Sequence, residues 1–381
     1  MTDIIRTGRR ALVVGAGISG LTAAAALGRN GWTVDLIERK PHIDDGGGVG
    51  LTLVANAMRA LDSIGVAGKC VDAGVPADRM VMRNPAGDIL LENPLPRIGG
   101  PEWPGGTGIT RAGFHAILVE AARPVCSMRC GVTVEKWDDG GNVEGGAITA
   151  SFSDGSTGRY DLAVAAEGLY SRTRALLMPG VGPQPTGQAV WRVSMPRPEG
   201  MDCTNMFLGG RHGVVGICPI SRDQAYMYIV QADDGLRRDE ATLHHQFRAE
   251  LEGYGEMVRQ LAGQIDSPEQ VSFRPLEWLL APPPWGKGRL VMIGDAVHAN
   301  PPVLAQGAAM GIEDAIVLAQ MLNEETDIDA GLARFVERRH PRVSAVVEAS
   351  CQLARWEVEG RKDVDVPGVM RNAALRLAEP I

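Results

Sequence analysis

The stretch ALVVGAGISGLTAAAALGRNGWTVDLIER, residues 11–39, decides the fold of this chain. It begins with the apolar run Ala11–Val14, passes through glycines in GxGxxG spacing into an alanine-rich segment, and closes with the alternating segment TVDLIE. This order predicts a strand, a helix and a second strand, the βαβ unit that binds dinucleotides. A lone GxGxxG is weak evidence, but this structural context indicates an adenine dinucleotide site.

Each glycine of the motif has its own physical role in such a unit. Gly15 permits a tight turn, Gly17 lets the backbone approach a pyrophosphate, and Gly20 lets the helix pack on the strand. Glu38, at the end of the second strand, is placed to accept hydrogen bonds from an adenosine ribose. On this motif alone, both NAD and FAD stay open as the ligand.

A second segment, GDAVHANPPVLAQGAAMGIEDA at residues 294–315, follows the apolar run Arg289–Ile293, which predicts a buried strand. Asp295 offers a carboxylate to ligand hydroxyls, and the two prolines stiffen the approach to a helix predicted from Gly307. Small residues at that helix start leave backbone N–H groups open to an anion or an electron-rich ring. Taken alone, the segment fits an ordinary strand–loop–helix joint equally well.

The composition indicates a soluble globular protein of 381 residues, with 45% hydrophobic and 22% charged residues. Its 38 basic and 46 acidic residues give a net charge of −8, which argues against nucleic acid or an anionic membrane as the principal partner. Six scattered cysteines form neither a disulfide framework nor a zinc pattern, and the N-terminus has no signal-peptide layout. We therefore expect a cytoplasmic protein without an integral membrane segment or a metal site.

With a third segment, LAVAAEGLYSRTR at residues 162–174, the two motifs resemble the single-component (group A) FAD-dependent aromatic hydroxylases, the family of the para-hydroxybenzoate and salicylate hydroxylases. The third segment departs from the family pattern at Glu167, where an aspartate is usual. The resemblance implies that NAD(P)H reduces FAD and that O2 then forms a flavin C4a-hydroperoxide, which hydroxylates an electron-rich aromatic ring. Neither a metal nor a protein nucleophile is needed for that chemistry.

The resemblance also implies cofactor contacts along the chain. Asp295 would hold the ribityl or ribose region of the flavin, and the helix start at Gly307 would face the pyrophosphate and isoalloxazine. Arg111 matches a family arginine near the FAD phosphates or ribose, with a solvated helix-start arginine as the alternative, and residues 46–61 resemble a loop along the flavin. The full set of implied cofactor-binding residues is Gly15, Gly17, Ile18, Gly20, Glu38, Arg39, Arg111, Val134, Gly168, Gly294, Asp295, Pro302, Gly307 and Ala308.

We expect an α/β fold with a Rossmann-like FAD-binding domain of the glutathione-reductase type, an inserted β-sheet substrate domain and C-terminal helices. The motifs predict a discontinuous FAD-binding domain of residues 1–75, 102–178 and 285–345. Strand-like, proline-containing segments assign residues 76–101 and 179–284 to the substrate domain, and residues 346–381 to a C-terminal helical segment. An amphipathic helix is predicted over residues 236–262, and a long helix followed by a shorter one from Glu337 onward. Monomer and homodimer both stay open.

Four side chains of the predicted substrate sheet are candidates for positioning the aromatic ring. Tyr226 and Tyr228 share one strand face, and a hairpin should join their strand to the preceding one. Arg192 is a further candidate, and His212 could accept the substrate's hydroxyl proton because its neutral form is available near pH 7. Packing tyrosines and a loop histidine are the ordinary alternatives, and His298 is interpreted as structural.

Two rival functions remain at this stage. A related flavin enzyme, such as a halogenase or a reductase, is disfavoured because the chain lacks a Trp-x-Trp-x-Ile-Pro segment and a CxxC pair. A flavin-binding regulatory protein would bind FAD without substrate-dependent NAD(P)H oxidation. The segments VWR and CQLARWE favour a hydroxylated, N-heterocyclic aromatic substrate through their similarity to family members of that kind, and the choice between NADH and NADPH stays open.

Overall fold

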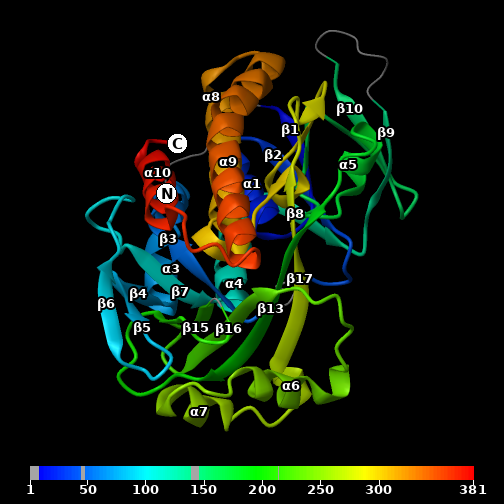
Figure 1. The fold of residues 1–381 in the computed structure, drawn as a ribbon. Coiled ribbons are helices and arrows are strands. Elements are labelled where there is room, and N and C mark those ends of the chain that lie inside the picture. Colours follow the sequence, from blue (N-terminus) through cyan, green and yellow to red (C-terminus); the bar gives the residue numbers. More distant parts are fainter. Residues whose placement is uncertain (1–7, 44–47, 139–145, 213) are drawn as a thin grey trace.

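The structure is a computed structural model that describes residues 8–43, 48–138, 146–212 and 214–381 (Figure 1). Its central element is a six-stranded sheet in which five neighbouring strands run parallel and β18 is antiparallel at one edge. The strand order is β18 (Gly286–Lys287), β19 (Leu290–Met292), β12 (Leu162–Ala165), β1 (Arg10–Val14), β2 (Thr33–Glu38) and β8 (Cys126–Cys130). The parallel strands β2 and β12 lie on opposite sides of β1. The carboxyl end of β1 is therefore a switch point, where ligands bind in such sheets.

Helices and a small sheet cover the parallel sheet on its two sides (Figure 1). The buried alanines and leucines of α1 (Ile18–Arg29) pack against α4 (Arg111–Ala122) and α8 (Gly307–Glu324). The three-stranded sheet on the other side consists of β9 (Val134–Asp138), β10 (Ile148–Phe152) and β11 (Thr157–Tyr160). The predicted βαβ unit and the predicted helix from Gly307 are therefore confirmed.

A second sheet of eight strands lies below the first in the view of Figure 1. Its order is β20 (His298–Ala299), β17 (Val271–Leu280), β13 (Gln184–Pro196), β16 (Gln224–Ala232), β15 (Val214–Pro219), β14 (Asn205–Leu208), β5 (Arg79–Arg83) and β6 (Ile89–Pro94). Antiparallel pairing of β15 with β16 confirms the predicted hairpin. Pairing of β20 with β17 joins the segment that contains the second motif directly to this sheet.

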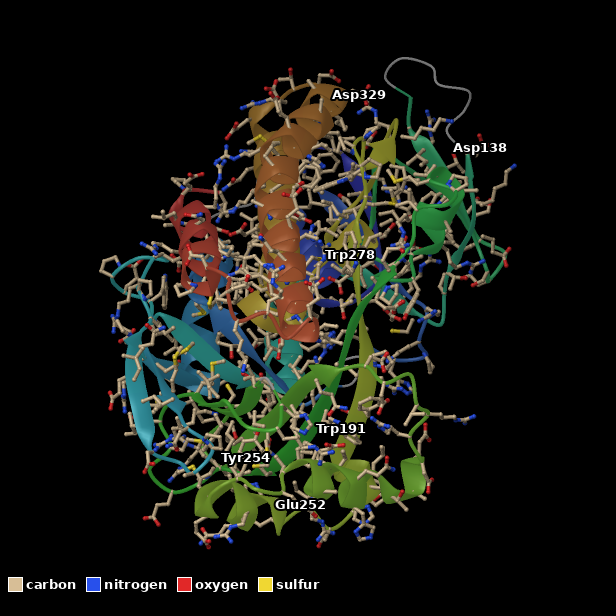
Figure 2. All side chains as sticks on the ribbon, viewed as in Figure 1. Asp138, Trp191, Glu252, Tyr254, Trp278 and Asp329 are labelled. Atoms are coloured by element: carbon tan, nitrogen blue, oxygen red, sulfur yellow. The ribbon has the colours of Figure 1, made fainter. Side chains whose placement is uncertain are left out.

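Two short helices, α6 (Leu243–Glu250) and α7 (Glu256–Ala262), close one face of the eight-stranded sheet (Figure 1). Trp191 is fully buried between sheet and helices, with ring centroids 6.0 Å from Phe247 and 4.6 Å from Phe273 (Figure 2). The prediction of one helix over residues 236–262 is wrong. The chain leaves the helical conformation between α6 and α7, where Gly253 has a φ of +89°.

The remaining elements lie outside the two large sheets and the small sheet of β9, β10 and β11. They are the small sheet of β3 (Gly50–Val54), β7 (Gly106–Thr110) and β4 (Val75–Ala77), and the helices α2 (Ala55–Asp62), α3 (Ala67–Ala73), α5 (Arg172–Leu177), α9 (Ile328–Val358) and α10 (Val366–Ala378). The long helix α9 contacts both α8 and the strands β13 and β17. A long helix and a shorter one were predicted from Glu337 onward, but α9 begins earlier because the Asp327 side chain caps it.

Candidate active site

The glycine turn after β1 has the geometry that a close ligand approach requires. Gly15 has a φ of +104°, and a Cβ at this position would lie 2.5 Å from the Ala166 carbonyl oxygen. A Cβ at Gly20 would collide with the Gly15 carbonyl oxygen, whereas none of the described atoms lies within 4 Å of the Cβ position at Gly17. Because no side chain caps α1 at Gly17, its first N–H groups remain available to an anion beside Ile18.

Glu38 lies at the end of β2, beside this turn. Its carboxylate accepts hydrogen bonds from the backbone N–H of Ala16 at 2.8 Å and of Lys40 at 2.9 Å. The N–H of Val132 donates to the Glu38 carbonyl at 3.0 Å, which brings the start of β9 with Val134 to the same edge. Arg39 is exposed beside them. Carboxylate oxygens have further acceptor capacity, so Glu38 is held in place and can still accept from a ribose.

The second motif packs directly against the first. Gly294 has a φ of +61°, and a Cβ there or at Gly311 would collide with Oγ of Ser19 in α1. These glycines allow the 3-10 turn η3 (Gly294–Ala296) and α8 to approach α1 closely. Ser19, between two motif glycines, is the contact that the sequence reasoning missed.

Asp295 lies in the 3-10 turn η3, directly after Gly294. Its side chain is exposed to solvent, yet burial among surrounding protein atoms raises its pKa, while nearby His298 and Arg111 act in the opposite direction. Arg111, at the first position of α4, is thus close enough to Asp295 to influence its charge. The structure brings these two predicted cofactor residues together.

The start of α8 is open in the same way as that of α1. The 3-10 turn η4 (Pro302–Leu304) is followed by Ala305 in the left-handed conformation at a φ of +53°, and Gln306 is the N-cap without a side-chain capping bond. None of the described atoms lies within 4 Å of the Cβ position at Gly307, and Ala308 is half-buried. Two helix N-termini with small residues are therefore available to a dinucleotide.

The third segment, residues 162–174, is hydrogen-bonded to the second motif. Glu167 accepts hydrogen bonds from Ser171 Oγ at 2.6 Å and from the Thr173 N–H at 2.9 Å at the start of α5. Arg174 donates to the Ala296 carbonyl at 2.9 Å, which ties α5 to η3. Gly168 has a φ of +78° and open space at its Cβ position. In this chain the longer acid at position 167 supports the first turn of α5, whose N-cap is Ser171.

On the eight-stranded sheet, the substrate candidates Arg192, Tyr226 and Tyr228 share one face. Arg192 stands opposite Tyr228 in the pairing of β13 with β16, and the two tyrosine rings are 5.6 Å apart. Strand neighbours alternate, so this face is the one turned away from the Trp191 core and its covering helices. Burial lowers the pKa of Arg192, with opposing influence from Tyr226 and a further lowering by Arg111. Arg111 therefore lies within electrostatic range of both Arg192 and Asp295.

His212 does not join this group. Its Nε2 is 3.0 Å from the Glu250 carboxylate at the end of α6, on the covered side of the sheet, and burial lowers its pKa. The structure brings Arg192 and Tyr228 together but places His212 elsewhere, because the β14–β15 loop folds back onto the α6–α7 layer. We therefore do not assign the substrate's proton to His212.

The side chain of Thr52 was missed by the sequence reasoning. Thr52 in β3 hydrogen-bonds to Tyr226, and its Oγ1 lies 3.6 Å from Cys218 Sγ. The signal was present, since Thr52 belongs to the 46–61 segment that resembles a flavin-contacting loop. Gly46 and Gly47 of that segment lie outside the described residues.

These features fit FAD. The open N-termini of α1 and α8, the held acid Glu38 and the exposed carboxylate of Asp295 provide places for the pyrophosphate, a ribose and the ribityl chain. Among the residues that the structure describes, no group of three His, Cys, Asp or Glu side chains is arranged to hold a metal ion. In the same part of the chain, no helix combines the length and the hydropathy needed to cross a membrane.

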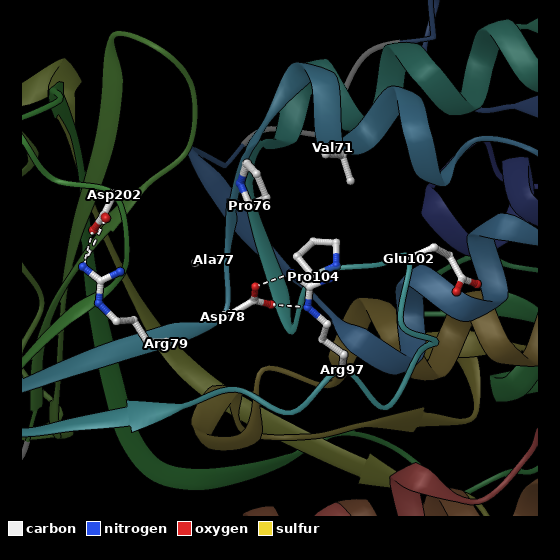
Figure 3. Close-up of a pocket in the computed structure, with 9 residues that line it drawn as sticks. All are labelled: Val71, Pro76, Ala77, Asp78, Arg79, Arg97, Glu102, Pro104 and Asp202. Atoms are coloured by element: carbon white, nitrogen blue, oxygen red, sulfur yellow. Dashed lines mark hydrogen bonds and ion pairs between the residues drawn. The ribbon is translucent and has the colours of Figure 1, made fainter.

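A separate surface hollow of about 530 Å³ lies beside β4 and β5 (Figure 3). Four of its charged groups form the ion pairs Arg97–Asp78 and Arg79–Asp202. None of the candidate site residues lines it. We therefore attribute no part of the site to this hollow.

Comparison with known proteins agrees with this geometry. The family model described as "FAD binding domain" matches residues 9–350. The chain is 32% identical over 360 residues to the 6-hydroxynicotinate 3-monooxygenase of Pseudomonas fluorescens, covering 90% of each protein. It is 31% identical over 360 residues to the 2-heptyl-3-hydroxy-4(1H)-quinolone synthase of Pseudomonas aeruginosa strain UCBPP-PA14, covering 91% of this chain and 90% of that protein.

A solved structure with a similar fold is that of HpxO from Klebsiella pneumoniae, complexed with FAD and uric acid. The TM-score is 0.83 at 23% sequence identity, and the match covers 100% of this chain and 95% of that chain. The similarity extends over both sheets and the C-terminal helices.

Proposed function

We propose a substrate class for this chain, which belongs to the FAD-binding-domain family and is an FAD-dependent, NAD(P)H-consuming monooxygenase. The substrate is a hydroxylated N-heterocyclic aromatic that binds as an anion. The names of two relatives support the ring class, because one acts on 6-hydroxynicotinate and the other is a hydroxyquinolone synthase. The reaction adds one oxygen atom of O2 to the ring at the expense of NAD(P)H. When bound, FAD accepts the electrons of NAD(P)H and activates oxygen.

The observation that carries the proposal is the state of Arg192. Within the described part of the chain, its guanidinium has no hydrogen-bond or ion-pair partner, although it is deep enough for burial to lower its pKa. A desolvated charge without a partner is costly, and a guanidinium cannot relieve the cost by losing its proton. An anionic substrate would supply the missing partner through a charge-assisted hydrogen bond.

Two tyrosines complete the proposed substrate contacts. Burial raises the pKa of both Tyr226 and Tyr228, so their hydroxyl groups stay protonated at neutral pH. A protonated phenol can donate a hydrogen bond to a ring oxygen or nitrogen. Tyr228, opposite Arg192, would orient the ring, while Tyr226 is held by Thr52 beside the proposed flavin loop.

The cofactor contacts are proposed from the geometry of the two helix starts. Gly15, Gly17, Ile18 and Gly20 would receive the pyrophosphate, and Glu38, Arg39 and Val134 would surround the adenosine. Gly168, Gly294 and Asp295 would hold the ribityl region, and Pro302, Gly307 and Ala308 would face the pyrophosphate and the flavin ring. Arg111 would neutralise phosphate charge near Asp295. The support for this assignment is the space left at Gly17, Gly168 and Gly307.

The setting of the reaction is also part of the proposal. We infer a cytoplasmic enzyme that acts on a small molecule as a monomer or homodimer. Its support is the set of six cysteines, all of which are free thiols, as expected in a reducing compartment.

The test is NAD(P)H oxidation by the FAD-loaded protein over hydroxylated benzoates, pyridines, purines and quinolones, with peroxide assayed in parallel. We expect an anionic hydroxylated heteroaromatic to accelerate oxidation and to yield a product heavier by one oxygen, with little peroxide. Stimulation only by neutral or carbocyclic compounds would contradict the proposed substrate class. Flavin binding without stimulation by any compound would favour a binding-only role.

A further inference from the structure

A cluster of buried charged and amide side chains joins the second motif to α2 and α9, outside the proposed ligand contacts. We refer to it as the Arg339 cluster. Each member is at most 9% exposed. Its members are Asn56, His298, Gln306, Glu313, Asp314, Arg339 and Arg342. Buried ionic groups are expensive unless every one is paired, so their arrangement calls for an explanation.

Asp314 holds the beginning of the second motif. Its carboxylate accepts hydrogen bonds from the Gly294 N–H at 2.9 Å, from His298 Nε2 at 2.6 Å and from Arg339 Nε at 2.8 Å. Gly294 immediately precedes Asp295, the proposed ribityl contact. The hydrogen bond from the Gly294 N–H to Asp314 therefore fixes the backbone next to Asp295.

Glu313, the neighbour of Asp314 in α8, is linked to the N-terminus of that helix. It accepts hydrogen bonds from Arg339 Nη1 at 2.7 Å and from Asn56 Nδ2 at 2.9 Å. Asn56 in turn exchanges amide hydrogen bonds of 3.1 and 3.2 Å with Gln306, the N-cap of α8. Gln306 immediately precedes Gly307 and Ala308, the proposed contacts at the helix start.

Arg339 connects the two branches because it donates to Asp314 and to Glu313 at once. The cluster also acts on the proposed ribityl contact, since His298 and Asp314 both influence the pKa of Asp295. We propose that Arg339 is a positioning residue for the flavin: its guanidinium sets the distance between the Asp295 loop and the α8 N-terminus. The inference rests on the proposed FAD contacts of those two places.

A purely stabilising role does not explain this arrangement. Well-packed hydrophobic residues commonly replace buried ion pairs with equal or greater stability. Here both acids terminate on backbone or amide groups that adjoin proposed ligand contacts, and a planar guanidinium supplies two directed bonds that a lysine cannot copy. Arg342, by contrast, reaches Glu313 and the last carbonyls of α10 but has no bond to Asp314.

The experiment compares Arg339→Lys with Arg342→Lys in the full chain. The flavin is removed, FAD is titrated back by fluorescence quenching, and the visible spectrum and midpoint potential of the reconstituted flavin are recorded. Val258→Ala, at a fully buried position of α7, serves as a control for general destabilisation. We expect Arg339→Lys to raise the FAD dissociation constant about ten-fold, roughly the equivalent of one charge-assisted hydrogen bond, and to shift the spectrum or potential. Arg342→Lys should have a smaller effect, and Val258→Ala should lower only the melting temperature.

Each outcome decides the proposal. An unchanged dissociation constant, spectrum and potential in Arg339→Lys would overturn it, as would an effect no larger than that of Val258→Ala. If Arg339→Lys does not fold, Asp314→Asn replaces it, because it weakens the grip on Gly294 with little change of shape. Asp295→Ala distinguishes failure of the proposed FAD contact from failure of the role of Arg339. Normal FAD affinity in Asp295→Ala would contradict the proposed contact itself. Weakened FAD affinity in Asp295→Ala together with unchanged FAD affinity in Arg339→Lys would contradict only the role of Arg339.

Discussion

The two sides of the proposed site treat charge in opposite ways. Around the second motif, Glu313, Asp314 and Arg339 are almost completely buried and every charge is paired within the protein. On the facing sheet, Arg192 is deep but has no hydrogen-bond or ion-pair partner among the described residues. A resident cofactor calls for a rigid site that is complete before binding, whereas a substrate that leaves at every turnover can itself supply the pairing.

The strongest way to break this contrast is to open the closed cluster. Arg339→Met would leave Glu313 and Asp314 buried with an important partner removed, so the free energy of unfolding should fall by about 3–5 kcal/mol. Urea unfolding of the apoprotein measures this loss. Adding Glu313→Gln and Asp314→Asn should restore part of the stability, because the uncompensated charge is then removed. An unchanged free energy of unfolding in Arg339→Met alone would show that the ion pairs of Arg339 contribute nothing to stability.

A smaller effect is expected where the cluster meets the proposed cofactor. Asp295→Ala removes an exposed carboxylate of the second motif, so FAD affinity should fall at least about ten-fold while the apoprotein keeps its melting temperature. Flavin content after purification and a fluorescence titration measure the change. Asp329→Ala, an exposed side chain at the start of α9, is the matched control (Figure 2). Full flavin content in the Asp295 variant would place the ribityl chain elsewhere.

The open side of the comparison is tested at Arg192. Arg192→Gln should raise KM for an anionic aromatic by about ten-fold and leave FAD affinity unchanged, because the lost bond is made to the substrate. The apoprotein should be as stable or more stable, since an unpaired buried charge is gone. Steady-state kinetics with an anionic substrate and a neutral analogue separate charge recognition from general packing. Equal losses for both analogues would argue against an anionic substrate.

The smallest effect is expected at His212, which lies on the covered face of the sheet. His212→Ala breaks the contact with Glu250, and kcat/KM should stay within about two-fold of the starting protein because neither group reaches the site face. Peroxide formation should also be unchanged. A large drop in kcat with a normal melting temperature would return His212 to the list of catalytic candidates.

Local chemistry made the cofactor side of the fold predictable. The turn at Gly15, the packing of Gly20 and the acid at Glu38 all depend on contacts within one βαβ unit, so their spacing in the sequence is sufficient. Strand alternation likewise placed Tyr226 and Tyr228 on one face. The division of the chain into discontinuous domains and the individual ligand contacts stay predictions.

Long-range packing decided the rest. In the sequence, Arg339 and Glu313 look like solvated helix charges, and only the packing of α9 on α8 buries and pairs them. The same limit applies to His212, because no local pattern tells which side of a sheet a glycine-flanked loop will fold toward. The sequence by itself thus determined the βαβ unit, the helix from Gly307 and the cofactor motifs, since turn sterics and side-chain periodicity act over a few residues. The tertiary structure alone decided which charges are paired among the described residues and which are not, because pairing depends on groups from helices and strands far apart in the chain.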